Sequence, residues 1–148
     1  MTEQERLERE AVVNEAKTWL GTPYHGNADI KGIGVDCGMF PLRVFSNVGL
    51  IEFHDPRPYP MQWPLHQSGE RYLAIVLTYA HEIQETAVGP GDVVMFKFGK
   101  GWAHGAIVID WPEIIHANPP GACRYDNVMQ NLSLRRMLPV RFFSVWPR

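Results

Sequence analysis

The order of the elements predicted along this sequence is typical of an α+β fold. Apolar residues recur at helical spacing up to about residue 83. From residue 89 the pattern changes to short apolar runs separated by Gly and Pro turns, which is typical of strands. Helices followed by strands indicate the α+β class. With 148 residues the chain can form its own core, and we expect a single domain over residues 1–148.

The first predicted helix spans residues 2–20. Thr2 and Glu5 have capping-box spacing, and Gly21 is a natural stop. One apolar stripe follows the helical period: Leu7, Ala11, Val12, Ala16, Trp19 and Leu20. Residues 21–34 are rich in Gly, Pro and Asn and are expected to form an irregular loop.

The apolar run after Cys37 predicts a second helix, from about Gly38 to Val48. Pro41 fits only in the first turn, where backbone N–H groups have no helical partner. Cys37 therefore lies at a helix N-terminus, where free N–H groups and the helix dipole stabilise a thiolate and an oxyanion. A free cysteine alone is more often a small buried hydrophobe, so a nucleophile also requires a base.

Residues 50–67 hold four prolines among Tyr, Met and Trp, which excludes a helix or a central strand. We expect an extended segment that either seals an edge of the core or lines a substrate groove. Ser68 is expected to cap a third helix over residues 69–83. Its inward residues are predicted to be Leu73, Val76, Leu77, Ala80 and Ile83.

Four strands are predicted in the second half of the chain, over residues 92–98, 103–110, 113–118 and 139–145. Residues 99–101 form a hairpin loop, and Trp111-Pro112 turns the chain again. The prolines of the last strand place it at a sheet edge. Residues 128–138 fit neither a helix nor a strand pattern.

His104 and His116 lie twelve residues apart, with Asp110 at their midpoint. A hairpin folded there makes them cross-strand neighbours on one face, because their separation is even. One imidazole can then act as a base while the other fixes its tautomer. Together with Cys37 this predicts nucleophilic catalysis. A zinc site could use the same three residues, but the short ligand spacings common in zinc sites are absent.

Cys123 is the rival nucleophile, because the neighbouring Arg124 could lower the pKa of its thiol. It has neither a helix start nor a paired base, so we expect a loop thiol. Two cysteines form at most one disulfide, which fits a reducing compartment.

Charge and hydropathy exclude several classes of partner. A net charge of −2 leaves no basic field for nucleic acid. No apolar run approaches membrane-spanning length, and the charged residues 1–6 do not begin a signal peptide. We expect no metal, cofactor, membrane or nucleic-acid partner.

Five segments carry a family resemblance: Ala16 to Tyr24, Val35-Asp36-Cys37, Gly89 to Phe96, His104 to Ile109, and Ile115-His116-Ala117. In this order they resemble the NlpC-type family of papain-like cysteine peptidases, which cut bacterial cell-wall peptides. The resemblance covers most of the chain. It implies a papain-like α+β fold whose nucleophile-bearing helix packs on a central antiparallel sheet.

The resemblance implies that Cys37 is the nucleophile, His104 the general base and His116 its orienter. It places Tyr24 beside the active site, to bind an oxyanion or substrate, and Asp36 against the free amine of a stem peptide. The implied reaction hydrolyses the γ-D-glutamyl–diamino acid bond of peptidoglycan through a Cys37 thioester.

Two features depart from the common family pattern. Gly38 replaces the Ser that follows the nucleophile in many members, which bears on amine recognition. Residues 63–73 resemble members encoded by tailed phages and prophages. That resemblance implies synthesis in the bacterial cytoplasm, incorporation in a phage tail and other tail proteins as partners. A non-catalytic tail subunit that binds the wall, and an amidase or acyltransferase using the same Cys/His pair, remain alternatives.

Overall fold

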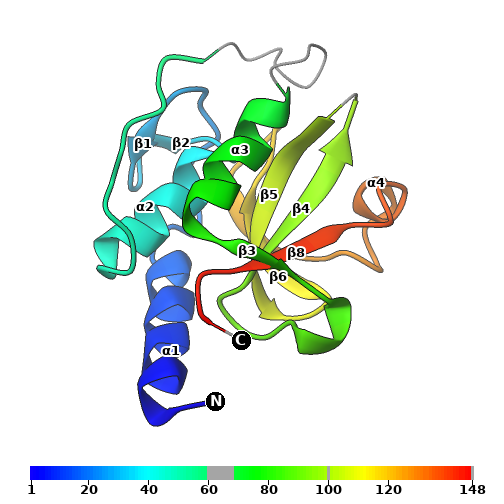
Figure 1. Ribbon diagram of the computed structural model, residues 1–148. Coiled ribbons are helices and arrows are strands. Elements are labelled where there is room, and N and C mark those ends of the chain that lie inside the picture. The colour runs from blue at the N-terminus through cyan, green and yellow to red at the C-terminus, as the bar shows by residue number, and fades with distance from the viewer. Residues whose placement is uncertain (60–68, 100, 148) are drawn as a thin grey trace.

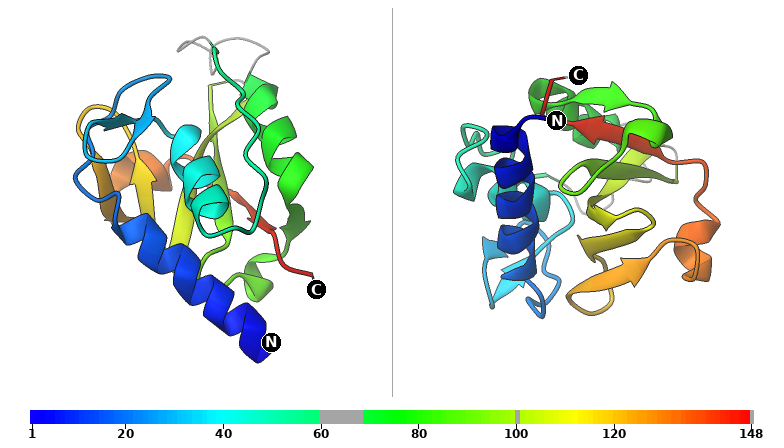
Figure 2. Two further views of the ribbon diagram at one scale, coloured as in Figure 1. Left: turned by 90° about the vertical axis from the view of Figure 1, so that its left-hand side faces the viewer. Right: turned by 90° about the horizontal axis from the view of Figure 1, so that it is seen from below.

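The computed structural model describes residues 1–59, 69–99 and 101–147, which form an α+β fold. Helices α1 (Glu3–Lys17), α2 (Met39–Asn47) and α3 (Gly69–Tyr79) cover one face of the sheet. The short α4 (Leu132–Arg135) lies toward the other face (Figure 1, Figure 2). The predicted fold class is confirmed.

Within the described residues the main sheet has six strands in the order β3-β8-β4-β5-β6-β7, and all neighbours are antiparallel. The strands are β3 (His81–Ile83), β4 (Val93–Phe98), β5 (Gly101–Asp110), β6 (Glu113–Ala117), β7 (Cys123–Asn127) and β8 (Arg141–Ser144). A small ladder of β1 (Asp29–Ile30) and β2 (Gly34–Val35) lies in the predicted loop, and a 3-10 turn spans Glu85–Ala87.

The first two helices lie where the sequence predicts them, but α1 ends at Lys17 and Leu7 of its predicted apolar stripe is 47% exposed. The Thr2 hydroxyl accepts the N–H of Glu5 at 3.1 Å, which is the predicted capping contact. Pro41 lies in the first turn of α2, where its missing N–H costs no helical hydrogen bond. Cys37 therefore lies two residues before α2.

Helix α3 is shorter than predicted. It ends at Tyr79, and His81–Ile83 form strand β3, which pairs with β8. Leu77, predicted to point inward, is 49% exposed, while Ile83 packs in the core on the opposite face of the sheet. The apolar spacing fits one long helix, but pairing with β8 satisfies the backbone of β3 and overrides that preference.

Strand β8 lies inside the sheet, so the predicted edge position is wrong. It pairs with β3 on one side and with β4 on the other. Pro139 precedes the strand and Pro147 follows it. The ladder therefore loses no N–H donor, and the prolines do not force the strand to an edge.

Strand β7 is missing from the sequence prediction. It follows the Pro119-Pro120-Gly121 turn and pairs with β6. Its first residue, Cys123, is a buried strand residue and not the predicted loop thiol. Residues 128–138, which fit neither pattern, contain the single turn of α4.

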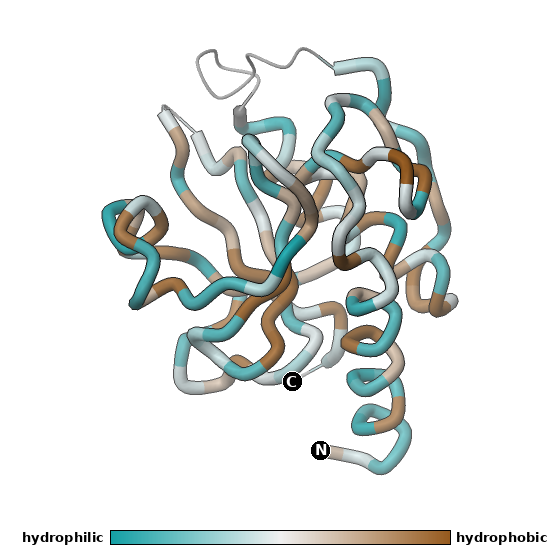
Figure 3. The backbone as a smooth tube through the Cα atoms, turned by 180° about the vertical axis from the view of Figure 1, so that it is seen from behind, coloured by the Kyte–Doolittle hydropathy of each residue, from teal (hydrophilic) through white to brown (hydrophobic). Residues whose placement is uncertain are grey.

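Hydrophobic side chains fill both faces of the sheet. The larger core packs beneath α1, α2 and α3, and a second core lies between the other face and α4. Figure 3 shows the hydrophobic residues gathered along the central strands, whereas α1 carries both kinds of residue. None of the described helices is long and apolar enough to cross a bilayer.

Candidate active site

Asp36 fixes the backbone that carries the candidate nucleophile. Its buried Oδ1 accepts the N–H groups of Gly38 at 3.1 Å and Met39 at 2.8 Å. Its carbonyl accepts the N–H of Phe40 at 3.1 Å. These contacts cap α2 in the way that an Asp N-cap does, with Cys37 enclosed between the capping residue and the helix. A helix start thus holds Cys37, as predicted.

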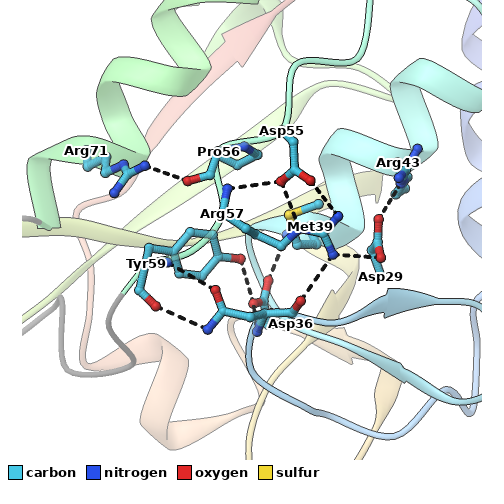
Figure 4. A network of polar contacts seen from close by, with 10 residues as sticks. Asp29, Asp36, Met39, Arg43, Asp55, Pro56, Arg57, Tyr59 and Arg71 are labelled. Carbon is cyan, nitrogen blue, oxygen red and sulfur yellow. Dashed lines mark hydrogen bonds and ion pairs between the residues drawn. The ribbon is translucent and has the colours of Figure 1, made fainter.

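The other carboxylate oxygen of Asp36 ties this helix start to the segment that precedes α3. It accepts the N–H of Asn27 at 2.7 Å and the hydroxyl of Tyr59 at 2.5 Å (Figure 4). Asn27 and Tyr59 also exchange two hydrogen bonds, each 3.1 Å long, between the Asn27 amide and the Tyr59 backbone. Four donors therefore hold one buried carboxylate.

Ion pairs extend this anchor along the segment. Arg57 lies 2.8 Å from Asp55 and 2.7 Å from Asp29, and Asp29 also binds Arg43 of α2 at 2.7 Å (Figure 4). Residues 50–59 form neither helix nor strand, as predicted, and they seal the core edge beside α2. Residues 60–67 and Ser68 lie outside the described residues, and the predicted groove along them stays a prediction.

His104 and His116 lie on adjacent strands with their rings hydrogen bonded. His104 Nε2 is 2.9 Å from His116 Nδ1. The predicted direct pairing is wrong by two residues, because Ile107 pairs with Ile115 and the register therefore places Ala106 opposite His116. A two-residue shift keeps both histidines on one face as diagonal neighbours, so the predicted contact survives.

Asp126 is a site residue that the sequence analysis misses. Its Oδ2 lies 3.0 Å from His116 Nε2, and its strand register, Ile114 to Asp126, again makes the two side chains diagonal neighbours. Asn131, the N-cap of α4, donates its Nδ2 to the same oxygen at 2.9 Å. The turn at residues 119–121 is the signal that could have predicted a returning strand beside His116.

Cys37 lies against the strand that carries the candidate base. Its Sγ is 3.8 Å from the carbonyl oxygen of Ala103, the residue before His104. Tyr72 of α3 donates its hydroxyl to the Cys37 carbonyl at 2.8 Å. A Cβ on Gly105 would lie 2.3 Å from that hydroxyl oxygen. Gly105 therefore leaves room for Tyr72 of α3 to reach the Cys37 carbonyl.

Tyr24 lies at the sulfur, where the resemblance places it. Burial, and then the neighbouring Cys37 and Asp36, raise the pKa of Tyr24 far above its usual value. The phenol therefore stays protonated and can donate a hydrogen bond to Cys37. The backbone N–H of Cys37 also faces its own sulfur. Together these two groups can serve as donors to a developing oxyanion.

The thiol and the base are both neutral at rest. Burial, with the Asp36 charge second, raises the pKa of Cys37 to about 12. Burial, with the charges of His116 and Arg124 next, lowers the pKa of His104 well below 6.5. Burial thus acts on the pKa of Cys37 in the opposite direction to the helix start and outweighs it. A neutral imidazole such as His104 can accept a proton from a neutral thiol.

Burial raises the pKa of Cys123 to about 12, although Arg124 acts in the opposite direction. The described residues hold no group of three or more His, Cys, Asp or Glu side chains that could bind a metal ion.

The sequence model of the NlpC/P60 family matches residues 21–141, well over half of the chain. The chain belongs to the NlpC/P60 family. This family assignment confirms the resemblance drawn from the five sequence segments. The likeness of residues 63–73 to phage and prophage members stays a prediction.

Curated NlpC/P60 relatives are similar to this chain over a fraction of their own length. The probable endopeptidase p60 of Listeria grayi is 33% identical over 122 residues, covering 82% of this chain and 20% of the relative. The probable endopeptidase p60 of Listeria seeligeri is 30% identical over 119 residues, covering 79% of this chain and 19% of the relative. The chain thus spans about a fifth of the length of these relatives.

Solved NlpC/P60 structures share the fold. The NlpC/p60 domain of the peptidoglycan hydrolase SagA matches with a TM-score of 0.64 and 20% identity, over 91% of this chain and 96% of that domain. NlpC1 from Trichomonas vaginalis matches with a TM-score of 0.67 and 17% identity, over 95% of this chain and 45% of that chain. The peptidoglycan hydrolase RipB from Mycobacterium tuberculosis matches with a TM-score of 0.64 and 16% identity, over 100% of this chain and 70% of that chain.

Proposed function

We propose that this chain is a cysteine endopeptidase that hydrolyses amide bonds in peptidoglycan stem peptides. The observation that carries the proposal is the hydrogen bond between the rings of His104 and His116, with His104 on β5, the strand that contacts the Cys37 sulfur. Support also comes from the family, whose similar members include proteins named as probable endopeptidases and peptidoglycan hydrolases.

In the proposed reaction, Cys37 Sγ attacks the scissile carbonyl while His104 takes the thiol proton. The Cys37 N–H and the Tyr24 hydroxyl stabilise the oxyanion. When the tetrahedral intermediate collapses, the C–N bond breaks and His104 gives the proton to the leaving amine. Water then hydrolyses the Cys37 thioester, with His104 again acting as base, and the free thiol returns.

We propose the γ-D-glutamyl–diamino acid amide as the scissile bond, as the family resemblance implies. Mass spectrometry of purified muropeptides after incubation with the protein tests both the activity and the bond. We expect two fragments whose masses place the cut at that amide. Intact muropeptides that remain bound would favour a wall-binding subunit, and transfer products would favour an acyltransferase.

The two cysteines provide a matched control for this assay. Cys37→Ala should abolish cleavage, because it removes the nucleophile. Cys123→Ala should retain it, because that thiol lies on β7 and no base is paired with it among the described residues. Cleavage by Cys37→Ala at the wild-type rate would overturn the proposed mechanism.

Asp36 enters this proposal as a helix-positioning residue and not by the amine contact that the resemblance implies. Its carboxylate is 1% exposed, and both oxygens already accept two donors. A contact between Asp36 and a free amine would add a hydrogen bond between charged groups, which contributes about 1.5–3 kcal/mol. That contribution corresponds to a preference for the free amine of roughly 10- to 150-fold in kcat/KM. We expect no such preference when stem peptides with free and N-acetylated first residues are compared.

Incorporation in a phage tail is a separate part of the proposal. It is supported by the similarity of residues 63–73 to phage and prophage members. Proteomic detection of the chain in purified tail particles would support it, and detection only outside them would contradict it.

A further inference from the structure

We propose that Asp126 is a positioning residue that sets the tautomer of His104 by acting through His116. The inference rests on the proposed function, in which His104 is the base that accepts the Cys37 proton. It adds to the Cys/His/His set a residue that no motif of the sequence indicates.

The three side chains form a line across three adjacent strands. His104 on β5 and His116 on β6 are diagonal neighbours, as are His116 and Asp126 on β7. Their contacts are 2.9 Å from His104 Nε2 to His116 Nδ1 and 3.0 Å from His116 Nε2 to Asp126 Oδ2. Sheet register therefore fixes the whole line.

The chemistry of the last member decides where each proton lies. A carboxylate only accepts hydrogen bonds, so His116 must carry its proton on Nε2. In a neutral imidazole the other nitrogen is then an acceptor, so His116 Nδ1 accepts a proton from His104 Nε2. His104 is thereby left with an unprotonated Nδ1, the nitrogen that can act as a base.

The other contacts of the Asp126 carboxylate also require it to act as a hydrogen-bond acceptor. Its Oδ2 also accepts from Asn131 Nδ2 at 2.9 Å and lies 3.7 Å from Arg124 Nε. Its Oδ1 accepts the backbone N–H of Asn127 at 3.0 Å. Every described partner is an N–H donor, so an amide in this place would turn its own N–H group toward one of them.

Nitrogen-15 NMR of the histidine rings tests the inference without a substrate. Long-range correlations on labelled wild-type protein at neutral pH distinguish the two neutral tautomers. We expect both His104 and His116 to be protonated at Nε2. Protonation of either ring at Nδ1 would overturn the inference, and this measurement needs no variant to fold.

Asp126→Asn supplies the second arm. We expect altered ring tautomers at His116 and His104 and a fall in kcat of about 10- to 100-fold, the size seen when the outer hydrogen-bond partners of metal-binding histidines are mutated. Asp110→Asn, the same change at the exposed end of β5, should leave both readouts unchanged. Unchanged tautomers in a folded Asp126→Asn protein would overturn the inference.

The two readouts separate this inference from the proposed function. If the wild type cuts no muropeptide but shows the expected tautomers, the proposed function fails and the tautomer assignment stands. If the wild type cuts muropeptides and Asp126→Asn leaves both kcat and the tautomers unchanged, only the role of Asp126 fails.

Discussion

The base side of the candidate site rests on a sheet, whereas the nucleophile side rests on buried polar contacts between distant segments. His104, His116 and Asp126 come from consecutive strands, so backbone register alone brings them together. Cys37 is held through Asp36 by Tyr59, which lies 23 residues further along the chain. Side chains on paired strands stay on the same face when the register shifts by two residues. The contact between Tyr59 and Asp36 is not part of a strand ladder, so it depends on how two distant segments pack.

The largest expected effect comes from removing His104, the proposed general base. His104→Ala should lower kcat/KM by about 10²- to 10⁴-fold, the usual contribution of a general base. The muropeptide assay measures the rate, and thermal unfolding checks that the sheet is intact. His25→Ala is the matched control, because His25 is exposed and its ring contacts only its own loop among the described hydrogen bonds. A loss smaller than tenfold would remove His104 from the mechanism.

On the nucleophile side, Tyr59→Phe should cost stability. The variant loses a buried hydrogen bond to a carboxylate, so the free energy of unfolding should fall by about 1.5–3 kcal/mol. Urea unfolding measures the change, and Tyr125→Phe on the exposed face of β7 is the control. Equal effects of the two substitutions would mean that Tyr59 does not anchor the helix start.

Gly105→Ala tests the point where the two sides meet. The new methyl group would clash with Tyr72, so we expect a loss of about 1–3 kcal/mol from overpacking. Tyr72→Phe removes only the hydroxyl that bonds to the Cys37 carbonyl. Because that hydroxyl is the nearest atom to the added Cβ, the double variant should lose less than the sum of the single losses. Strict additivity would show that the contact does not couple α3 to β5.

The same contrast explains how much of the site could be predicted from the sequence. The pairing of His104 with His116 follows from strand periodicity, and it survives a wrong register because two residues is one full period. Cys37 at a helix start follows from the apolar run and Pro41. These are local patterns, which a sequence carries directly.

The missing parts depend on contacts that no local pattern encodes. Asn27 and Tyr59 meet Asp36 only after three segments have packed together. To predict the contact of Asp126 with His116, strand β7 has to be predicted first, and its residues alternate only weakly in polarity. Burial, which reverses the expected pKa shift of Cys37, exists only in the folded chain.

The smallest expected effect concerns pH, and it distinguishes the two sides by their ionisation. Burial lowers the pKa of both His104 and His116 below 6.5 in the folded chain. Below pH 6.5 the unfolded chain therefore binds protons that the folded chain does not bind. The free energy of unfolding then decreases as the pH is lowered, until the pH reaches the pKa values of the folded chain. The carboxylates of the anchor, Asp29 and Asp55, have pKa values lowered from about 3.8 by their arginine partners. Their contribution to stability is therefore lost only below about pH 3.8, as the pH falls through their folded pKa values.

Between about pH 5 and pH 6.5 the loss should thus come from the base side, since histidine titrates there in unfolded chains and carboxylates largely do not. Urea unfolding across this range should show a decline that is smaller in His104→Gln. As the pH is lowered, kcat/KM should stay unchanged through pH 6.5 and fall only well below it, because the lowered pKa keeps His104 a neutral base. An acid limb centred at or above pH 6.5 would instead indicate an exposed imidazole, and it would contradict the buried arrangement from which the mechanism starts.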